Sequence, residues 1–540
     1  MAAGGSGGGG GMTGGGADPG QVPAVPVPRL PMNGADVGTM RKSGSRRPKF
    51  VWEAPLVAPG QTIEYEIQYS TDMALSEAVS VRTERTEYQV DSDLDVELLP
   101  PVGKRYYWRV RACTPRGCSR FSPVSWFNVG RVRCDFNADG YDDVAVSAVS
   151  VTSSRDDVVY FYYGQAGAEF EAMVNGEISS SDDATRGFGS SLSCAGDVDG
   201  DGLADILVGA PSSDAHNGEA RLYFSDGGED FSGRFVDRLS GMREDGQFGG
   251  SVAAVGDVNG DGFDDVAVGE WAAPYAYLYM GDASGRLSRS VELSLGVSAQ
   301  DLSAMASSAG DVNGDGFSDV MVSFVSSSSA RHQTVRLYSG GPGATLDAEP
   351  EMELMPPTED SSFASAAASA GDMNGDGFGD VIVGSPGIDR AYIYLGSPEG
   401  LNPVPDLTLD GQGSTSFGLV VASAGDMNGD GFGDVAVGTA DYVGSPGAVY
   451  VYAGGAGAAL DNRPDVAFHA PALGDGFGSV LGSSGDLNGD GYSDLVVAAP
   501  SGDAVYIFLG QSDLRTPDVE GGSVSQPLSD LTFGAAVSRR

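Results

Sequence analysis

The sequence has few of the groups on which enzyme catalysis usually depends. Its 540 residues include three histidines, His216, His332 and His469, which are dispersed and share no metal-ligand or nucleophile spacing. The one Gly-x-Ser-x-Gly pattern, residues 4–8, falls in a glycine-rich stretch and not on a strand-to-helix turn. No Gly-x-x-x-x-Gly-Lys-Ser/Thr phosphate loop occurs. The sequence therefore predicts no catalytic site and a protein that is not an enzyme.

Positive charge is also scarce. Lys and Arg together number 31, against 75 Asp and Glu, which gives a formal net charge of −44. Such an excess of negative charge repels nucleic acid and anionic lipid, so neither is expected as a partner. The chain has no run of eighteen apolar residues, so we expect no membrane-spanning helix.

Cysteine is limited to four residues, which fall in two pairs. Cys113 and Cys118 flank a turn-like tetrapeptide, which favours a bridge across the end of a hairpin. Cys134 and Cys194 each stand shortly before one copy of a repeated motif, and the sequence leaves open whether they pair or stay free. The even count and this placing favour an oxidising compartment.

The feature that the sequence does contain in abundance is the nine-residue pattern Asp-x-Asn-x-Asp-Gly-x-x-Asp, with Asp for Asn in the second copy. Its copies begin at Asp135, Asp197, Asp257, Asp311, Asp372, Asp426 and Asp486, at steps of 54 to 62 residues. Repetition at this period indicates a repeat architecture in which each unit is one supersecondary element. A short apolar run such as residues 381–384 follows each copy and predicts a strand.

The residue types in this pattern are those that bind a hard cation. Side-chain oxygens at positions one, three, five and nine and the backbone carbonyl at position seven can surround an ion, and glycine at position six permits the sharp turn. Calcium takes six to eight oxygen ligands, whereas magnesium requires near-ideal octahedral geometry. A single copy could be an Asx-rich turn that binds nothing, but seven copies favour up to seven Ca²⁺ ions.

The predicted metal ligands are Asp135, Asn137, Asp139, Tyr141, Asp143, Asp197, Asp199, Asp201, Leu203, Asp205, Asp257, Asn259, Asp261, Phe263, Asp265, Asp311, Asn313, Asp315, Phe317, Asp319, Asp372, Asn374, Asp376, Phe378, Asp380, Asp426, Asn428, Asp430, Phe432, Asp434, Asp486, Asn488, Asp490, Tyr492 and Asp494.

Two further signals accompany the loops. A Phe-Gly pair stands nine residues before most of them, as at Phe188 and Phe417, and Gly-Ala-Pro or a variant follows the next strand, as at residues 209–211. Phe-Gly, calcium loop and Gly-Ala-Pro resemble the FG-GAP repeat, and the array over residues 131–540 resembles the seven-bladed β-propeller of integrin α subunits. The resemblance implies an all-β fold with about four strands per blade. A last Phe-Gly pair, at Phe533, has no loop after it, which predicts that the C-terminal strand completes the first blade.

The N-terminal quarter has a different character. Residues 1–49 are Gly-rich, then Pro-rich, then basic; they predict a disordered tail and show no secretory signal. Residues 50–130 predict alternating strands. The segment 107–112, Tyr-Trp-Arg-Val-Arg-Ala, resembles the last hairpin of a fibronectin type III domain, which implies an N-terminal β-sandwich. The expected domains are thus 1–49, 50–130 and 131–540.

The integrin-like resemblance also implies a function. It suggests an extracellular or cell-surface, calcium-binding, non-catalytic adhesion, recognition or scaffold protein; a secreted or periplasmic location is also compatible with it. The implied partner is a protein or glycan ligand on the propeller face opposite the calcium loops. In this chain that face would carry the segments 212–218, 240–247, 326–333 and 439–445. The alternative is a polysaccharide lyase or hydrolase built on the propeller scaffold.

Overall fold

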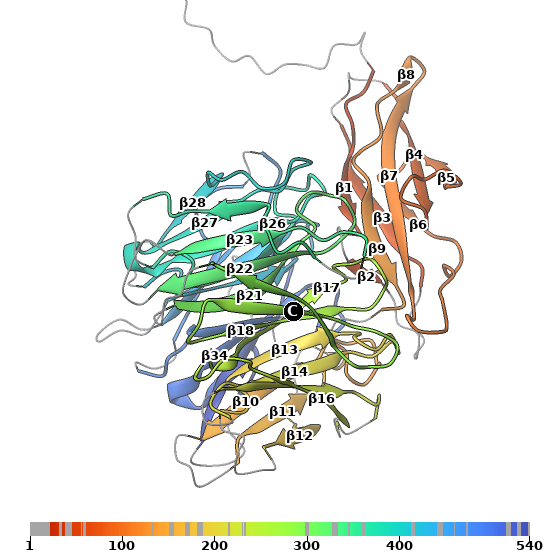
Figure 1. Cartoon of the computed structure of the whole chain (residues 1–540). Coiled ribbons are helices and arrows are strands. Elements are labelled where there is room, and N and C mark those ends of the chain that lie inside the picture. Colours follow the sequence, from red (N-terminus) through yellow and green to blue (C-terminus); the bar gives the residue numbers. More distant parts are fainter. Residues whose placement is uncertain are drawn as a thin grey trace, which may run out of the picture.

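A computed structural model of the chain describes residues 22–537 with interruptions (Figure 1). The residues left out within this range are 32–34, 38–45, 56, 58–60, 132–133, 151–155, 168–172, 181–186, 214–216, 229–230, 232–233, 297–301, 327–332, 344–345, 359–361, 412–415, 440–446, 458–459, 471–473, 515–519 and 526–530. The regular secondary structure of the described residues is almost entirely β-strand, with short 3-10 helices such as η3 (Pro386–Ile388) and η5 (Pro500–Gly502). The predicted all-β class is confirmed.

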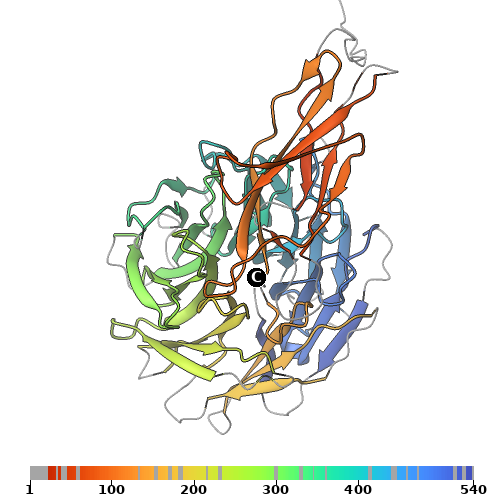
Figure 2. The same ribbon diagram turned by 90° about the vertical axis from the view of Figure 1, so that its right-hand side faces the viewer.

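Residues from 144 onward form seven four-stranded antiparallel sheets, the blades of a β-propeller (Figure 2). Blade 1 comprises β10 (Val144–Ser150), β11 (Val158–Tyr162), β12 (Gly176–Ser179) and β37 (Leu531–Val537); blade 2, β13 (Ser191–Gly196), β14 (Asp205–Ala210), β15 (Glu219–Phe224) and β16 (Arg234–Ser240); blade 3, β17 (Phe248–Gly256), β18 (Asp265–Glu270), β19 (Tyr275–Met280) and β20 (Ser288–Ser294); blade 4, β21 (Leu302–Gly310), β22 (Asp319–Ser326), β23 (Thr334–Tyr338) and β24 (Met352–Leu354); blade 5, β25 (Ala367–Gly371), β26 (Asp380–Ser385), β27 (Arg390–Tyr394) and β28 (Leu407–Asp410); blade 6, β29 (Val420–Gly425), β30 (Asp434–Thr439), β31 (Ala448–Tyr452) and β32 (Val466–His469); blade 7, β33 (Val480–Gly485), β34 (Asp494–Ala499), β35 (Ala504–Phe508) and β36 (Glu520–Ser525).

The apolar runs that follow the loops become strands buried on both faces. In β26, Val381 and Val383 pack into a core cluster shared with blade 4, whereas Ile382 packs into one shared with blade 6. Successive side chains of a strand point to opposite faces of its sheet, so each blade is held between its two neighbours. Full burial of one such side chain stabilises the fold by about 1.5–3 kcal/mol. This packing explains why these strands read as continuous apolar runs and not as alternating ones.

Strand β37, at the C-terminal end, completes blade 1. It pairs antiparallel with β10, with Ala148 opposite Phe533 and Val146 opposite Val537. Blade 1 therefore consists of three strands from the start of the repeats and one from the end, as the ring-closure hypothesis requires. Because the strand is supplied from the other end of the chain, no edge of blade 1 is left open at this position.

The seven repeated motifs, loops 1 to 7 in chain order, lie in a circle. In each pair of neighbours, the backbone N–H at position eight of one loop donates a hydrogen bond to the carbonyl at position one of the loop before it. These bonds join Ala204 to Asp135, Asp264 to Asp197, Ser318 to Asp257, Gly379 to Asp311, Gly433 to Asp372, Ser493 to Asp426 and Asp142 to Asp486. The last of them returns from loop 1 to loop 7, so the circle is closed.

The N-terminal unit is a β-sandwich, as expected. One sheet consists of β1 (Val27–Leu30), β3 (Lys49–Glu53) and β6 (Glu87–Gln89), and the other of β2 (Ala35–Val37), β9 (Ser125–Val129), β7 (Lys104–Thr114), β4 (Glu64–Ser70) and β5 (Val79–Thr83), with β8 (Gly117–Cys118) paired to β7. Phe50, Trp108 and Phe127 are fully buried between the sheets. The Cys113–Cys118 disulfide closes the β7–β8 hairpin, which confirms that pairing.

The predicted disordered tail is wrong for the described part of residues 1–49. Residues 27–30 pair antiparallel with β3, and residues 35–37 pair in parallel with β9. Prolines are compatible with an extended strand at a sheet edge. Composition alone cannot identify a partner strand that lies elsewhere in the sequence. Residues 1–21, 32–34 and 38–45 lie outside the described residues.

Among the described residues, no helix has the length and apolar character needed to cross a bilayer.

Candidate metal centres

Loop 5 illustrates how the sequence builds each of the seven loops. Asp372 Oδ1 accepts the backbone N–H of Gly375 at 2.7 Å and its Oδ2 accepts the N–H of Gly377 at 2.8 Å. Asn374 Oδ1 accepts the N–H of Asp376 at 2.8 Å, and Asp376 Oδ1 accepts the N–H of Phe378 at 3.1 Å. The side chains at positions one, three and five are thus turned back into their own loop.

The aspartate at position nine has a second task, because it anchors the loop to the blade. In loop 5, Asp380 is fully buried; its Oδ2 accepts the N–H of Met373 at 2.7 Å and its Oδ1 accepts the N–H of Gly396, after the next strand, at 2.8 Å. Each carboxylate oxygen can accept more than one bond. Position nine can therefore hold the loop in shape and still offer an oxygen to a cation.

Glycine at position six is required by the backbone. Gly377 has a φ of +94° and the equivalent Gly262 a φ of +97°, a region that residues with a Cβ rarely adopt. At position four, a Cβ on Gly375 would come within 2.7 Å of the Phe432 ring, which belongs to the next loop. The aromatic residue at position seven of one loop therefore packs on the glycine at position four of the preceding loop. The same pattern that shapes a loop also fits it to its neighbour.

The electrostatics of the loops favour a bound positive charge. Burial, together with the nearby carboxylates of Asp376 and Asp430, raises the pKa of Asp372 to about 7 and that of Asp426 to about 6. The pKa of the fully buried Asp380 is raised well above its usual range, first by burial and then by the charge of Asp372. Buried carboxylates in such proximity are costly when ionised. A cation among them would offset this cost.

Loop 2 shows the fit to a metal ion most directly. One carboxylate oxygen from each of Asp197, Asp199 and Asp205 lies within 4.8 Å of the other two. Asp197 is 2% exposed, and its Oδ1 has no hydrogen-bond partner. A buried carboxylate oxygen left without a partner, next to two further carboxylates, is a donor set suited to a hard cation such as Ca²⁺.

All the predicted ligand residues lie in the described part of the chain. Among the described residues, carboxylate oxygens gather at metal-ligand spacing in loop 2, from Asp197, Asp199 and Asp205; the ligand sets of the other six loops stay predictions. The Cys134–Cys194 disulfide, which the sequence left open, is formed and ties the residue before loop 1 to strand β13 of blade 2.

Sequence reasoning missed position eight: the carboxylate of Asp264 accepts the backbone N–H of Asp197 at 2.8 Å, and Ser493 Oγ accepts that of Asp426 at 3.1 Å. The only available signal was the polar residue at position eight of several copies.

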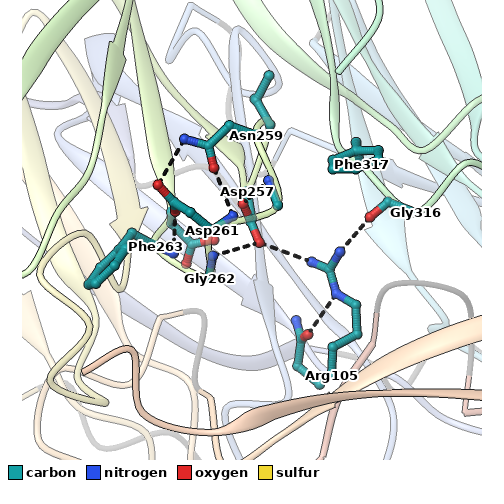
Figure 3. Close-up of polar contacts among 12 residues, drawn as sticks. Arg105, Asp257, Asn259, Asp261, Gly262, Phe263, Gly316 and Phe317 are labelled. Atoms are coloured by element: carbon teal, nitrogen blue, oxygen red, sulfur yellow. Dashed lines mark hydrogen bonds and ion pairs between the residues drawn. The ribbon is translucent and has the colours of Figure 1, made fainter. Parts of the chain in front are cut away.

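Sequence reasoning also missed the contacts between the sandwich and the loops (Figure 3). Arg105, on β7, lies with Nη2 3.5 Å from Asp257 Oδ2 of loop 3. Its Nη1 donates to the carbonyl of Gly316 in loop 4, and its guanidinium stacks 4.0 Å from the Trp126 ring centroid. Trp126 Nε1 in turn donates to Asp311 Oδ2 at 3.0 Å. The N-terminal domain thus rests on the face of the ring that carries the loops.

Comparison with known proteins identifies the repeats. FG-GAP-like repeats match residues 257–322 and 372–437, and FG-GAP repeats match residues 188–223 and 477–514. The chain therefore carries FG-GAP repeats, which confirms that part of the resemblance.

Individual relatives match over short stretches. Integrin alpha-5 of Xenopus laevis is 30% identical over 210 residues, which are 36% of this chain and 20% of the relative. Human phosphatidylinositol-glycan-specific phospholipase D is 37% identical over 156 residues, 25% of this chain and 18% of the relative. A solved structure of a protein from Lactobacillus plantarum aligns over 74% of this chain and 98% of its own at a TM-score of 0.46 and 10% identity. The chain spans about a fifth of the curated relatives, one named as an integrin and the other as an enzyme, so the likeness identifies repeats and not an activity.

Proposed function

We propose that this protein is a calcium-binding, non-catalytic recognition or scaffold protein whose β-propeller is integrin-α-like, with up to seven Ca²⁺ ions in loops 1 to 7. The observation that carries the proposal is the orphaned Oδ1 of buried Asp197, beside Asp199 and Asp205, in a loop built like the six others. Bound Ca²⁺ would supply positive charge among the loop carboxylates and would draw their oxygens into one coordination shell. The residues of the chain supply the oxygen ligands and the bonds that hold the loops in a circle.

The proposed ligand is a protein, bound on the propeller face opposite the loops. Two observations support this choice of face. The N-terminal domain rests on the loop face, through contacts such as that of Arg105 with Asp257. The connections at the other ends of the strands present large apolar side chains to solvent: Met242 is 74% exposed and Trp271 is 42% exposed. Exposed aromatic and methionine side chains are typical of recognition surfaces. The segment 240–247 is described, whereas residues 214–216 of the segment 212–218 and most of 326–333 and 439–445 lie outside the described residues.

The proposed location is extracellular, at the cell surface or in another oxidising compartment. The support is the pair of disulfides, Cys113–Cys118 and Cys134–Cys194, which use all four cysteines. Disulfides persist where thiols are not kept reduced. A calcium-stabilised fold also suits the millimolar calcium found outside cells, because extracellular calcium modules have Kd values of about 10⁻⁴ to 10⁻³ M.

Calorimetric titration of chelator-stripped protein tests the calcium proposal. We expect uptake of several calcium ions per chain and a melting temperature that rises with calcium. Binding to the folded state alone would contribute roughly 0.4–1.4 kcal/mol per site at about 1 mM calcium. Magnesium at the same concentration serves as the control and should restore little of the stability. A folded chain that takes up no calcium, or a melt insensitive to chelator, overturns the proposal.

A further inference from the structure

Loop 3 differs from loop 2 in the charges placed against it. The Arg105 side chain is 14% exposed, and its Nη2 lies 3.5 Å from Asp257 Oδ2. Arg131 is also close, since a Cβ on Gly262 of loop 3 would come within 2.9 Å of its Nη2. Burial raises the pKa of Asp257, while Arg105 and Arg131 lower it. Two fixed positive charges, both from residues before the first loop, therefore act on the first ligand of loop 3.

The charges around loop 2 have the opposite sign. The charges that act most strongly on Asp197 are the carboxylates of Asp264, Asp201 and Asp199, and the Oδ1 of Asp197 has no partner. The sandwich approaches this loop through neutral groups: the backbone N–H of Val102 donates to the carbonyl of Gly200 at 2.9 Å. Arg234, a positive side chain that acts on Asp199 of loop 2, is exposed, and its effect on the pKa of Asp199 is smaller than those of burial and of Asp201.

A guanidinium next to Asp257 does part of what a bound cation would do, because it neutralises the carboxylate. It also repels a divalent ion placed in the same loop, and this repulsion is strong at short range in a partly buried site. We propose that Arg105 of the N-terminal domain lowers the calcium affinity of loop 3 below that of loop 2, and that calcium in loop 3 weakens the docking of the N-terminal domain on the propeller. The inference rests on the proposed calcium function.

The calcium affinity of loop 3 and the docking of the N-terminal domain are thermodynamically linked. If docking lowers the affinity of loop 3 for calcium by some factor, calcium in loop 3 must lower the docking equilibrium by the same factor. The contacts that Arg105 and Trp126 make with loops 3 and 4 are polar: Arg105 contacts Asp257 and the carbonyl of Gly316, and Trp126 donates to Asp311. Low calcium thus favours a seated N-terminal domain, and high calcium favours its release from loop 3.

A double-mutant cycle in the full chain tests the affinity half, with calcium titrated against a chelating indicator. Arg105→Gln should raise the affinity of one site about tenfold, a factor that corresponds to about 1.4 kcal/mol. Asp261→Asn, which removes a ligand charge from loop 3, should abolish that gain in the double variant. Arg109→Gln is the matched control, because Arg109 lies on the same strand but contacts Gln68 and Phe121. Arg105→Lys keeps the charge and should retain the low affinity.

The outcomes separate the inference from the function on which it rests. If no variant takes up calcium, the calcium function itself is wrong. If the chains bind calcium but Arg105→Gln leaves the isotherm unchanged, or Arg105→Lys gains as much affinity as Arg105→Gln, the inference is wrong.

Hydrogen exchange at the Val102 amide, which donates to the carbonyl of Gly200 across the interface, tests the effect of calcium on docking. Its exchange should quicken in the wild-type chain at the calcium concentration that fills the weakest site; unchanged or slower exchange overturns this half.

Discussion

The side chain of Asp142 accepts a hydrogen bond from the backbone N–H of Asp486 at 2.9 Å, which joins loop 1 to loop 7 across 344 residues of sequence. The backbone N–H of Asp142 also donates to the carbonyl of Asp486 at 3.1 Å. Asp264 and Asp197 make the same two bonds between loops 2 and 3. The joint that closes the ring is therefore built like a joint inside it.

Replacement of Asp142 by alanine should weaken this joint. It removes the acceptor for a backbone N–H, and an unsatisfied donor of this kind costs about 1–3 kcal/mol. Urea unfolding should show a loss of that size. Glu177→Ala, in strand β12 of the same blade, removes an exposed acidic side chain and should change stability little. Equal stabilities for the two variants would contradict the role assigned to Asp142.

Deletion of residues 531–540 should destabilise the whole propeller and not merely shorten its end. The deletion removes β37, and β10 would then present an unpaired edge in blade 1. We expect a lower melting temperature and a single transition that still includes blades far from the cut. Differential scanning calorimetry makes the comparison. A melt identical to that of the full chain would show that β37 contributes nothing to ring stability.

Asp376→Asn should reduce the calcium-dependent part of the stability. The change preserves the shape of the side chain and the acceptor for the N–H of Phe378, but it removes one ligand charge from loop 5. The loss should be about the contribution of one site, roughly 0.4–1.4 kcal/mol at about 1 mM calcium. It should vanish in chelator. Glu399→Gln removes an exposed charge outside the loops and serves as the control in the same melting experiment.

Glu270, the last residue of β18, should make stability depend on pH. It is fully buried, accepts the hydroxyl of Tyr277 at 3.2 Å and lies 3.8 Å from Arg243 Nε. Its pKa is raised to about 7, because burial, with a smaller contribution from the charge of Glu292, outweighs the lowering by Tyr277 and Arg243. Because the folded-state pKa exceeds the unfolded value, the folded chain binds more protons, and the contribution of Glu270 to stability is lost as pH rises from about 4.5 to about 7.

The matching variant is Glu270→Gln, which keeps an acceptor for Tyr277 but does not titrate. The stability of the variant relative to the wild-type chain should increase between pH 5 and pH 8, by about 1–3 kcal/mol. Denaturant unfolding at several pH values measures this difference. A difference that stays constant with pH would contradict the assignment.

The parts of the fold that could be predicted have local signatures. The loops carry glycines at positions of positive φ, and their predicted ligand oxygens stand on alternate residues. Loop 5 can therefore be recognised between Asp372 and Asp380 from the sequence alone. The strand after it, with Val381 and Val383, shows the apolar run of a doubly buried strand. The last Phe-Gly pair, at Phe533, indicated a strand without a loop, and this strand pairs with β10.

The parts that could not be predicted depend on contacts between distant residues. Nothing in the local sequence distinguishes Arg105 from Arg109, which lies further along the same strand. Yet Arg105 contacts Asp257 of loop 3, whereas Arg109 contacts Gln68 within the sandwich. The docking of one domain on another is decided by the shape and charge of both surfaces, which composition does not contain. The same reason accounts for the strand at residues 27–30, whose order comes from its partner β3.

The Cys134–Cys194 disulfide makes the seven joints of the ring unequal. It fixes blade 1 to blade 2 by a covalent bond, whereas blade 1 meets blade 7 through hydrogen bonds and packing such as those of Asp142 with Asp486. The chain itself passes from β36 of blade 7 into β37 of blade 1, and β37 is paired to β10 through the backbone. A pull on the C-terminal end therefore loads the β37–β10 pairing first, while the disulfide keeps the first two blades together.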